Sequence, residues 1–158
     1  MMVTFVTIKG DRHMPQLQLE NFLPYRLSRA AAISSSQLAR IYRRTYQLTI
    51  PEWRTLATLG QFGEMTAKAV GQHSSMHKTK VSRAVASLHR RRWLKRRTDE
   101  ADRRIEHLTL TPQGLRAYGR LKPEMLLYED RLLASLSASE RETVLKGVAL
   151  LEKALGAH

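Results

Sequence analysis

Basic side chains are concentrated between residues 76 and 104, where their type and spacing suit the binding of a polyanion. This segment holds 11 of the 27 lysines and arginines but only 3 of the 14 acidic residues, so it carries +8 of the formal net charge of +13. Guanidinium groups bind phosphate and guanine edges through paired hydrogen bonds. The basic residues are Lys78, Lys80, Arg83, Arg90, Arg91, Arg92, Lys95, Arg96, Arg97, Arg103 and Arg104. Their clustering favours nucleic acid as the partner.

The basic segment could instead serve solubility or bind a membrane surface. A solvated basic face would raise solubility, although solubility does not require clustering. A helix lying on an anionic membrane would need Trp, Phe and Leu opposite its charges, whereas the apolar side of this segment is rich in Ala and Val. Double-stranded DNA accounts for the pattern better than either a solubility role or a membrane-surface role.

Other chemistries find little support in the sequence. Cysteine is absent, which excludes disulfides and thiolate chemistry and favours the cytoplasm. The longest uncharged stretch, residues 30–39, is half of the roughly 20 residues that span a bilayer, so no membrane association is expected. No catalytic motif is present, and we predict neither an enzyme nor a bound cofactor.

A metal site is not expected either. His73 and His77 lie four residues apart, as zinc ligands can, but they lack a third ligand. The remaining histidines form no cluster in the sequence: His13, His89, His107 and His158.

The elements that position the basic segment are predicted to be mainly helical. Before it, helices are expected over residues 17–48, from Pro51 until Gly60 and Gly63 stop the second one, and over residues 67–72 with Thr66 as N-cap. A fourth helix, residues 77–91, carries many of the basic side chains. Strands over residues 93–97 and 105–110 then form a hairpin with a basic tip.

The C-terminal part is predicted to be two helices. Thr111 and Pro112 open the first, which continues toward residue 136 with a bend at Pro123, and Ser137 to Glu140 form a capping box for the second. Apolar residues in the last helix follow heptad-like spacing and need a partner helix: Val144, Val148, Leu151 and Leu155. The apolar face of the first helix also needs a partner and comprises Leu23, Leu27, Ala31, Leu38, Ile41 and Thr45.

A helix-turn-helix requires a small residue, a tight turn four residues later and a branched apolar residue six further on, and Gly71, Ser75 and Val81 have this spacing. With the hairpin that follows, the chain resembles the MarR family of bacterial transcription regulators from about residue 19 to residue 155. The most specific match is Asp102-Arg103-Arg104 followed by Leu-Thr-Pro-Gln-Gly at residues 110–114. Pro51 to Leu56, Lys80 to Val85 and Arg92-Trp93-Leu94 also match.

The resemblance implies a homodimer with a winged helix-turn-helix. Residues 16–48 and 112–158 would form the dimerisation helices, residues 49–111 the DNA-binding lobe, and residues 1–15 a flexible N-terminal segment. Two positions depart from the family: Arg92 and Ser75 replace glycines. Arg92 must therefore take a left-handed conformation, at a cost of about 1 kcal/mol, or the helix must end differently.

The predicted DNA contacts lie on the fourth helix and the hairpin tip. Arg83 is placed to read guanine in the major groove, beside Ser82, although contact with phosphate alone or pairing with an acid of the scaffold stays an alternative. The helix N-terminus favours phosphate, which would be bound by His77, Lys78, Thr79 and Lys80. The resemblance suggests that Arg103 or Arg104 enters the minor groove while Asp102 orients it. Trp53 is expected in the core.

These observations predict a dimeric, ligand-responsive repressor or regulator that binds a pseudo-palindromic operator. The ligand response follows from the resemblance alone, since similar proteins bind small aromatic or phenolic acids; no residue identifies a ligand site. Alternatives are a non-specific architectural DNA-binding protein without an effector, and a basic interaction or membrane-surface module.

Overall fold

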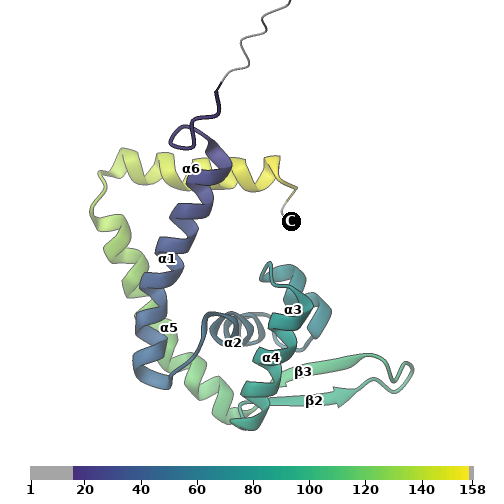
Figure 1. The fold of residues 1–158 in the computed structure, drawn as a ribbon. Helices are drawn as coiled ribbons and strands as arrows, with labels where there is room; N and C mark the ends of the chain where they lie inside the picture. The colour runs from purple at the N-terminus through teal and green to yellow at the C-terminus, as the bar shows by residue number, and fades with distance from the viewer. Residues whose placement is uncertain (1–15, 157–158) are drawn as a thin grey trace, which may run out of the picture. The chain divides into compact units, whose positions relative to one another are not determined.

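The computed structural model describes residues 16–156 of the chain (Figure 1). Residues 1–15, predicted as a flexible segment, lie outside the described residues. The described part forms six helices and three short strands, in agreement with a mainly helical chain carrying a small sheet. In chain order they are α1 Leu23–Tyr46, α2 Ile50–Phe62, β1 Met65–Thr66, α3 Ala67–His73, α4 Lys78–Arg90, β2 Leu94–Thr98, β3 Glu106–Leu110, α5 Pro112–Ala134 and α6 Ala138–Ala154.

Most helix starts follow from side-chain caps visible in the sequence. The predicted N-caps Thr66, Thr111 and Ser137 each accept a hydrogen bond from a backbone N–H in the first turn, and Ser137 forms the predicted capping box with Glu140. A second capping box forms between Thr49 and Glu52 at the start of α2, whose first residue, Ile50, directly precedes Pro51. These local bonds satisfy N–H groups that would otherwise be unpaired.

One prediction about a helix interior is corrected. Gly60 does not stop α2, because the helix runs to Phe62 and ends at Gly63, whose φ of 77° is left-handed. The missing Cβ of Gly60 instead leaves room for the ring of Tyr118, which would lie 2.5 Å from it. Pro123 lies inside α5, and the helix continues past it to Ala134, as the sequence predicts.

The sheet contains the predicted hairpin and one additional strand. The order is β1-β3-β2, with both pairs antiparallel, and Leu94 opposite Leu110 sets the register of the hairpin. In β1, Met65 pairs with Leu108. This strand was not predicted because two residues are too few to display a period of two.

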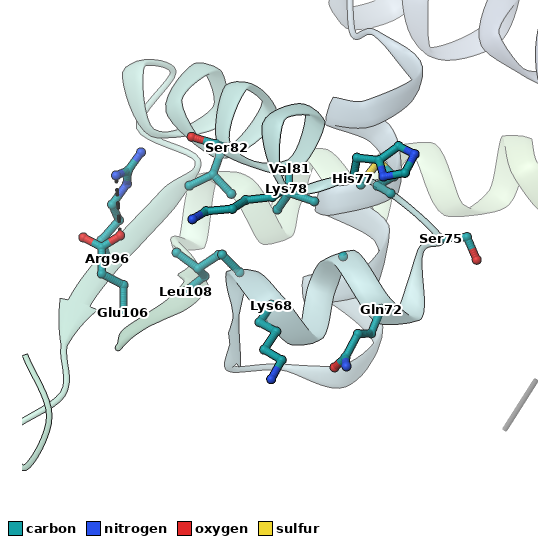
Figure 2. Close-up of a pocket in the computed structure, with 14 residues that line it drawn as sticks. Lys68, Gln72, Ser75, His77, Lys78, Val81, Ser82, Arg96, Glu106 and Leu108 are labelled. Carbon is teal, nitrogen blue, oxygen red and sulfur yellow. Dashed lines mark ion pairs between the residues drawn. The ribbon is translucent and has the colours of Figure 1, made fainter. Parts of the chain in front are cut away.

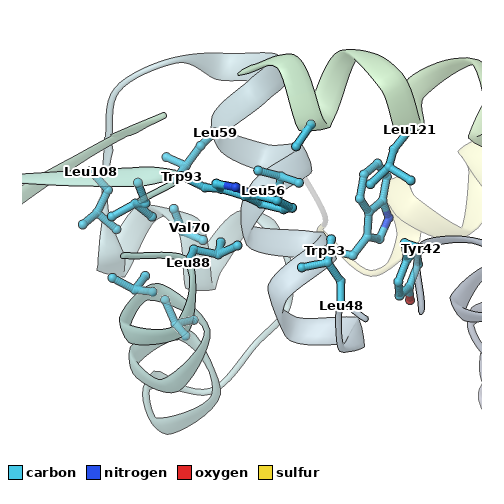
Figure 3. Close-up of a cluster of buried hydrophobic side chains, with 14 of the residues drawn as sticks. Tyr42, Leu48, Trp53, Leu56, Leu59, Val70, Leu88, Trp93, Leu108 and Leu121 are labelled. Carbon is cyan, nitrogen blue, oxygen red and sulfur yellow. The ribbon is translucent and has the colours of Figure 1, made fainter. Parts of the chain in front are cut away.

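The core lies in the part of the chain that carries the basic segment. Most of its buried side chains come from α2, α3, α4 and the sheet, with further ones from the end of α1 and from α5, and they include Leu56, Leu59, Val70, Leu88 and Leu108 (Figure 3). Trp53 is 9% exposed and stacks on Tyr42 at 5.5 Å between ring centroids, which confirms its expected packing role. This core fixes α4 and the hairpin on one rigid lobe.

The chain divides into two units, residues 1–34 and 35–158, and α1 begins in the first and ends in the second. The predicted helix of residues 17–48 is shorter at both ends. Within the second unit the buried residues of α1 are Ala39 and Tyr42, whereas the predicted Leu38 and Ile41 are half-buried. The Tyr42 ring packs on Trp53, and Leu38 packs against the same core.

Large apolar side chains of α5 and α6 remain exposed in the single chain. None of the described residues of α6 is buried. The exposed large apolar residues of these two helices and of the α6 C-cap are Leu115, Leu126, Leu127, Leu132, Val144, Leu145, Val148, Leu150 and Leu155. The apolar side chains that were predicted to need a partner surface are therefore not covered by other parts of the described chain. Among the described helices, none has the length and apolar character that crossing a bilayer requires.

Candidate nucleic-acid interface

The turn between α3 and α4 has the close packing of a helix-turn-helix. A Cβ on Gly71 would lie 3.0 Å from the Met76 carbonyl oxygen and 3.4 Å from a methyl of Val81, so the small residue is required. Val81 is 1% exposed and pins α4 onto the lobe. The predicted spacing of Gly71, Ser75 and Val81 is thus confirmed as a packing arrangement.

The two residues that depart from the family, Ser75 and Arg92, occupy equivalent positions after the ends of α3 and α4. Ser75 and Arg92 have φ angles of 52° and 60°. Each follows the end of a helix, and the next residue closes the turn: Met76 N donates to Gly71 O and Trp93 N donates to Leu88 O. These are the hydrogen bonds of the left-handed helix cap that usually contains glycine. Arg92 therefore takes the left-handed conformation, the first of the two expected outcomes.

Helix α4 separates its apolar residues from its polar ones. Val81, Ala84, Val85 and Leu88 are buried. The predicted DNA contacts on this helix are all exposed: Lys78, Thr79, Lys80, Ser82 and Arg83. His77 is the N-cap residue, is also exposed and makes no side-chain cap bond, which leaves its ring available at the positive end of the helix.

Three of the basic side chains form hydrogen bonds or ion pairs with other residues of the protein. Arg91 donates to the Tyr46 carbonyl oxygen at 2.8 Å and lies over the Trp93 ring. Arg97 pairs with Glu64 at 2.7 Å, and Arg96 pairs with Glu106 at 3.6 Å. The other eight side chains form no hydrogen bond or ion pair within the described chain: Lys78, Lys80, Arg83, Arg90, Arg92, Lys95, Arg103 and Arg104. Arg83 in particular has no acidic partner among residues 16–156.

Arg90 is a candidate contact that the sequence did not single out. It is exposed and lies seven residues, close to two helical turns, after Arg83. The two guanidinium groups therefore project from the same face of α4. The spacing of seven is visible in the sequence and could have identified it.

The tip of the hairpin is ordered by two aspartates. Asp99 Oδ1 accepts the backbone N–H groups of Ala101 and Asp102, both at 2.9 Å, and Asp102 Oδ1 accepts the N–H of Arg104 at 2.9 Å. Asp102 thus orients Arg104 through its backbone rather than through its guanidinium group. Arg103 and Arg104 are both exposed at this tip.

His107 joins the tip to the rest of the lobe, although the sequence placed it in no cluster. Its Nε2 lies 2.9 Å from Asp99 Oδ2, and its Nδ1 lies 3.4 Å from Glu64 Oε1. The Asp102 N–H, the His107 ring and the Ala101 N–H lower the pKa of Asp99 to about 2. Asp99 therefore carries a full negative charge at neutral pH.

The motif residues around Trp93 and Thr111 hold α4 to α5. Thr111 Oγ1 donates to the Arg92 carbonyl oxygen at 2.7 Å and accepts the Gly114 N–H at 3.1 Å. A Cβ on Gly114 would overlap the Trp93 carbonyl oxygen, so this position requires glycine. The Leu-Thr-Pro-Gln-Gly sequence is therefore a structural junction between α4 and α5.

A hollow of about 690 Å³ lies between α3, α4 and the hairpin (Figure 2). Its apolar lining includes Val81 and Leu108, and its cationic lining includes Lys68, Lys78 and Arg96. The hairpin extends away from the helices of the lobe, as Figure 1 shows.

The two histidines considered as metal ligands have other surroundings. The His73 ring packs on Phe62 with centroids 4.3 Å apart. Within residues 16–156, no group of three metal-ligating side chains is assembled.

Comparison with known proteins identifies the same region. The MarR family model matches residues 46–105, from the last residue of α1 to the end of the hairpin loop. The MarR family regulator SPO1453 from Silicibacter pomeroyi is 26% identical, with a TM-score of 0.70 over 86% of this chain and 98% of that one. No curated protein matches the sequence.

Two further solved structures are similar in fold. The PcaV regulator from Streptomyces coelicolor, crystallised with its natural ligand, is 22% identical with a TM-score of 0.71, covering 90% of this chain and 99% of that one. BpsR from Bordetella bronchiseptica, whose DNA binding is regulated by 6-hydroxynicotinic acid, is 20% identical with a TM-score of 0.69, covering 80% and 98%.

The family match covers the helix-turn-helix, β2 and the hairpin loop, and the similarity in fold extends over most of the chain. The predicted mainly helical, winged helix-turn-helix fold is therefore confirmed, and the resemblance to the MarR family is supported over residues 46–105. Proteins of this family are transcriptional regulators rather than enzymes. Residues 46–105 match the MarR family of transcriptional regulators, and the described chain has the winged helix-turn-helix fold of the similar MarR family structures.

Proposed function

We propose that the protein is a cytoplasmic, ligand-responsive repressor that binds a pseudo-palindromic operator as a homodimer. The observation that carries this proposal is the set of eight basic side chains without internal partners on α4, its exit and the hairpin. Two copies of α4 would enter successive major grooves, so the half-sites would lie about 10–10.5 bp apart.

Each part of the lobe has a distinct role in this proposal. Arg83, with Ser82 beside it, reads a base pair, and His77, Lys78, Thr79 and Lys80 bind phosphate at the helix N-terminus. Arg90 extends the contact along the same helix face. Arg103 or Arg104 enters the minor groove next to the recognised major groove.

The homodimer is supported by the exposed apolar side chains of α5 and α6. We assign residues 16–48 and 112–158 to the dimerisation region and residues 49–111 to the DNA-binding lobe. Exposed apolar side chains of this kind are stabilised by burial against a second copy.

A hollow of about 520 Å³ between α2 and α5 supports the ligand response. Trp53, Phe62 and Tyr118 line it with aromatic rings, and His73 and Lys122 add groups that can bind an anion. This chemistry suits a small aromatic or phenolic acid. The regulation of BpsR by 6-hydroxynicotinic acid is a precedent in the same fold.

DNA binding is tested by selecting genomic fragments with the purified protein and measuring affinity for a selected fragment and for a random duplex at one salt concentration. Replacing Arg83 with Ala should weaken binding to the selected fragment by about 5- to 150-fold, with little change on random DNA. Replacing Lys78 with Ala should weaken both duplexes equally and lower the salt slope by about one unit. Arg44→Ala, an exposed charge on α1, is the matched control.

Equal affinity of the wild-type protein for both duplexes would support the architectural alternative instead. A protein that remains monomeric in sedimentation measurements at micromolar concentration would contradict the operator geometry. Displacement from anionic vesicles by DNA distinguishes DNA binding from the membrane-surface alternative.

A further inference from the structure

The chain Arg97–Glu64–His107–Asp99 links the hairpin tip to the loop between α2 and β1. Glu64 Oε1 accepts from Arg97 at 2.7 Å and lies 3.4 Å from His107 Nδ1. On its other side the ring reaches Asp99 Oδ2 at 2.9 Å. The tip is thereby tied to a part of the lobe outside the hairpin.

The two carboxylate oxygens of Asp99 contact different groups at the hairpin tip. Oδ1 accepts the N–H groups of Ala101 and Asp102, while Oδ2 faces the His107 ring. The Asp99 N–H also donates to the Ile105 carbonyl oxygen at 2.9 Å, which closes the loop. The carboxylate is therefore fixed from both sides and holds the backbone that carries Arg104.

Charge alone does not account for these carboxylates. Asp99 and Glu64 lie close to a surface that, in the proposed function, meets phosphate groups, and their negative charge opposes that approach. A carboxylate near the DNA-binding surface therefore needs a favourable contribution to binding that offsets this repulsion. The hydrogen bonds above identify that contribution as the shape of the loop.

We propose that Asp99 and His107 are positioning residues for DNA binding: they fix the loop of residues 99–105 before DNA arrives, so that Arg104 is presented to the duplex. This inference rests on the proposed role of the hairpin in DNA binding. Ordering each backbone residue opposes binding, so a loop that is already ordered binds more tightly than a free one.

The experiment compares Asp99→Ala with Glu106→Ala in wild-type and Arg104→Ala backgrounds. Glu106 is the matched control because it lies on the same hairpin, pairs with Arg96 and makes no bond to the tip. Both substitutions remove one negative charge, so electrostatics alone predicts tighter DNA binding for both. Positioning predicts that D99A binds the selected fragment about 5- to 30-fold more weakly, whereas E106A binds at least as tightly as wild type.

The double variant and hydrogen exchange separate positioning from general damage. In the R104A background, D99A should cause no further loss of affinity. Exchange of the Ala101 and Asp102 amides should accelerate in D99A and in His107→Leu, and Asp99→Asn, which keeps one acceptor oxygen, should restore part of the protection.

Three results would overturn the inference: D99A binding as tightly as E106A, a loss that persists undiminished without Arg104, or unchanged exchange at the loop amides. Failure of the proposed function has a different signature. In that case R104A and R83A would bind the selected fragment as the wild type does, whatever the exchange rates show.

Discussion

Replacing Thr55 with Val should stabilise the protein. Thr55 and Thr58 are both buried in α2, at 0% and 6% exposure. The Thr58 hydroxyl donates to the Arg54 carbonyl oxygen at 2.8 Å, whereas the Thr55 hydroxyl has no hydrogen-bond partner among the described residues. Valine has nearly the same size and shape as threonine, so T55V removes an unpaired polar group without opening a cavity.

The expected gain follows from the desolvation of that hydroxyl. An unpaired buried polar group costs about 1–3 kcal/mol, so the free energy of unfolding should rise by a similar amount. At about 2–4 °C per kcal/mol for a chain of this length, Tm should rise by about 2–12 °C. Helix propensity contributes little, because Thr and Val have similar values.

Urea and thermal unfolding of T55V, T58V and wild type test this prediction. All samples need one protein concentration, because association makes Tm depend on it. T58V is the matched control and should lose about 0.5–1.5 kcal/mol, since it removes a satisfied hydrogen bond. The reasoning is refuted if T55V is less stable than wild type or if both variants shift Tm in the same direction and by the same amount.

Two further predictions concern α5 and the hairpin. Gly114→Ala should destabilise the protein by about 3 kcal/mol, because the new Cβ overlaps the Trp93 carbonyl oxygen. Gly119→Ala in the same helix meets nothing within 4 Å and should stabilise the protein by up to about 1 kcal/mol. Thermal unfolding of both variants tests whether the two changes have opposite signs. Asp99 should titrate near pH 2 by carboxyl NMR, and because its folded pKa is depressed, its contribution to stability should be present above pH 3.8 and be lost as pH falls toward 2; a midpoint near 3.8 would contradict the hydrogen-bonding arrangement at the tip.

Features that depend on neighbouring residues could be predicted from the sequence. The caps at Thr66, Thr111 and Ser137 are confirmed because a hydroxyl and an N–H three residues later suffice to form them. The hairpin and the spacing around Gly71 are likewise local. The exposed face of α4 followed from the period of its apolar residues, which is why its basic side chains were located correctly.

Features that depend on contacts between distant residues could not be predicted. Glu64 and His107 are 43 positions apart in the sequence, and neither lies in a recognisable motif. The role of Gly60 is set by Tyr118, and the pairing of Arg97 with Glu64 removes one of the arginines counted as available for DNA. In each case the tertiary neighbour, which has no local signature, decides what the residue does.

The junction at Thr111 gives α5 the mechanics of a lever. Its hydroxyl joins the exit of α4 to the first turn of α5, and Gly114 seats that turn directly on the backbone of Trp93. A helix of 23 residues is about 35 Å long, so a swing of only ~5° about this fulcrum carries its far end through ~3 Å. A small rotation at the Thr111 junction would therefore produce a larger displacement at the C-terminal end of α5.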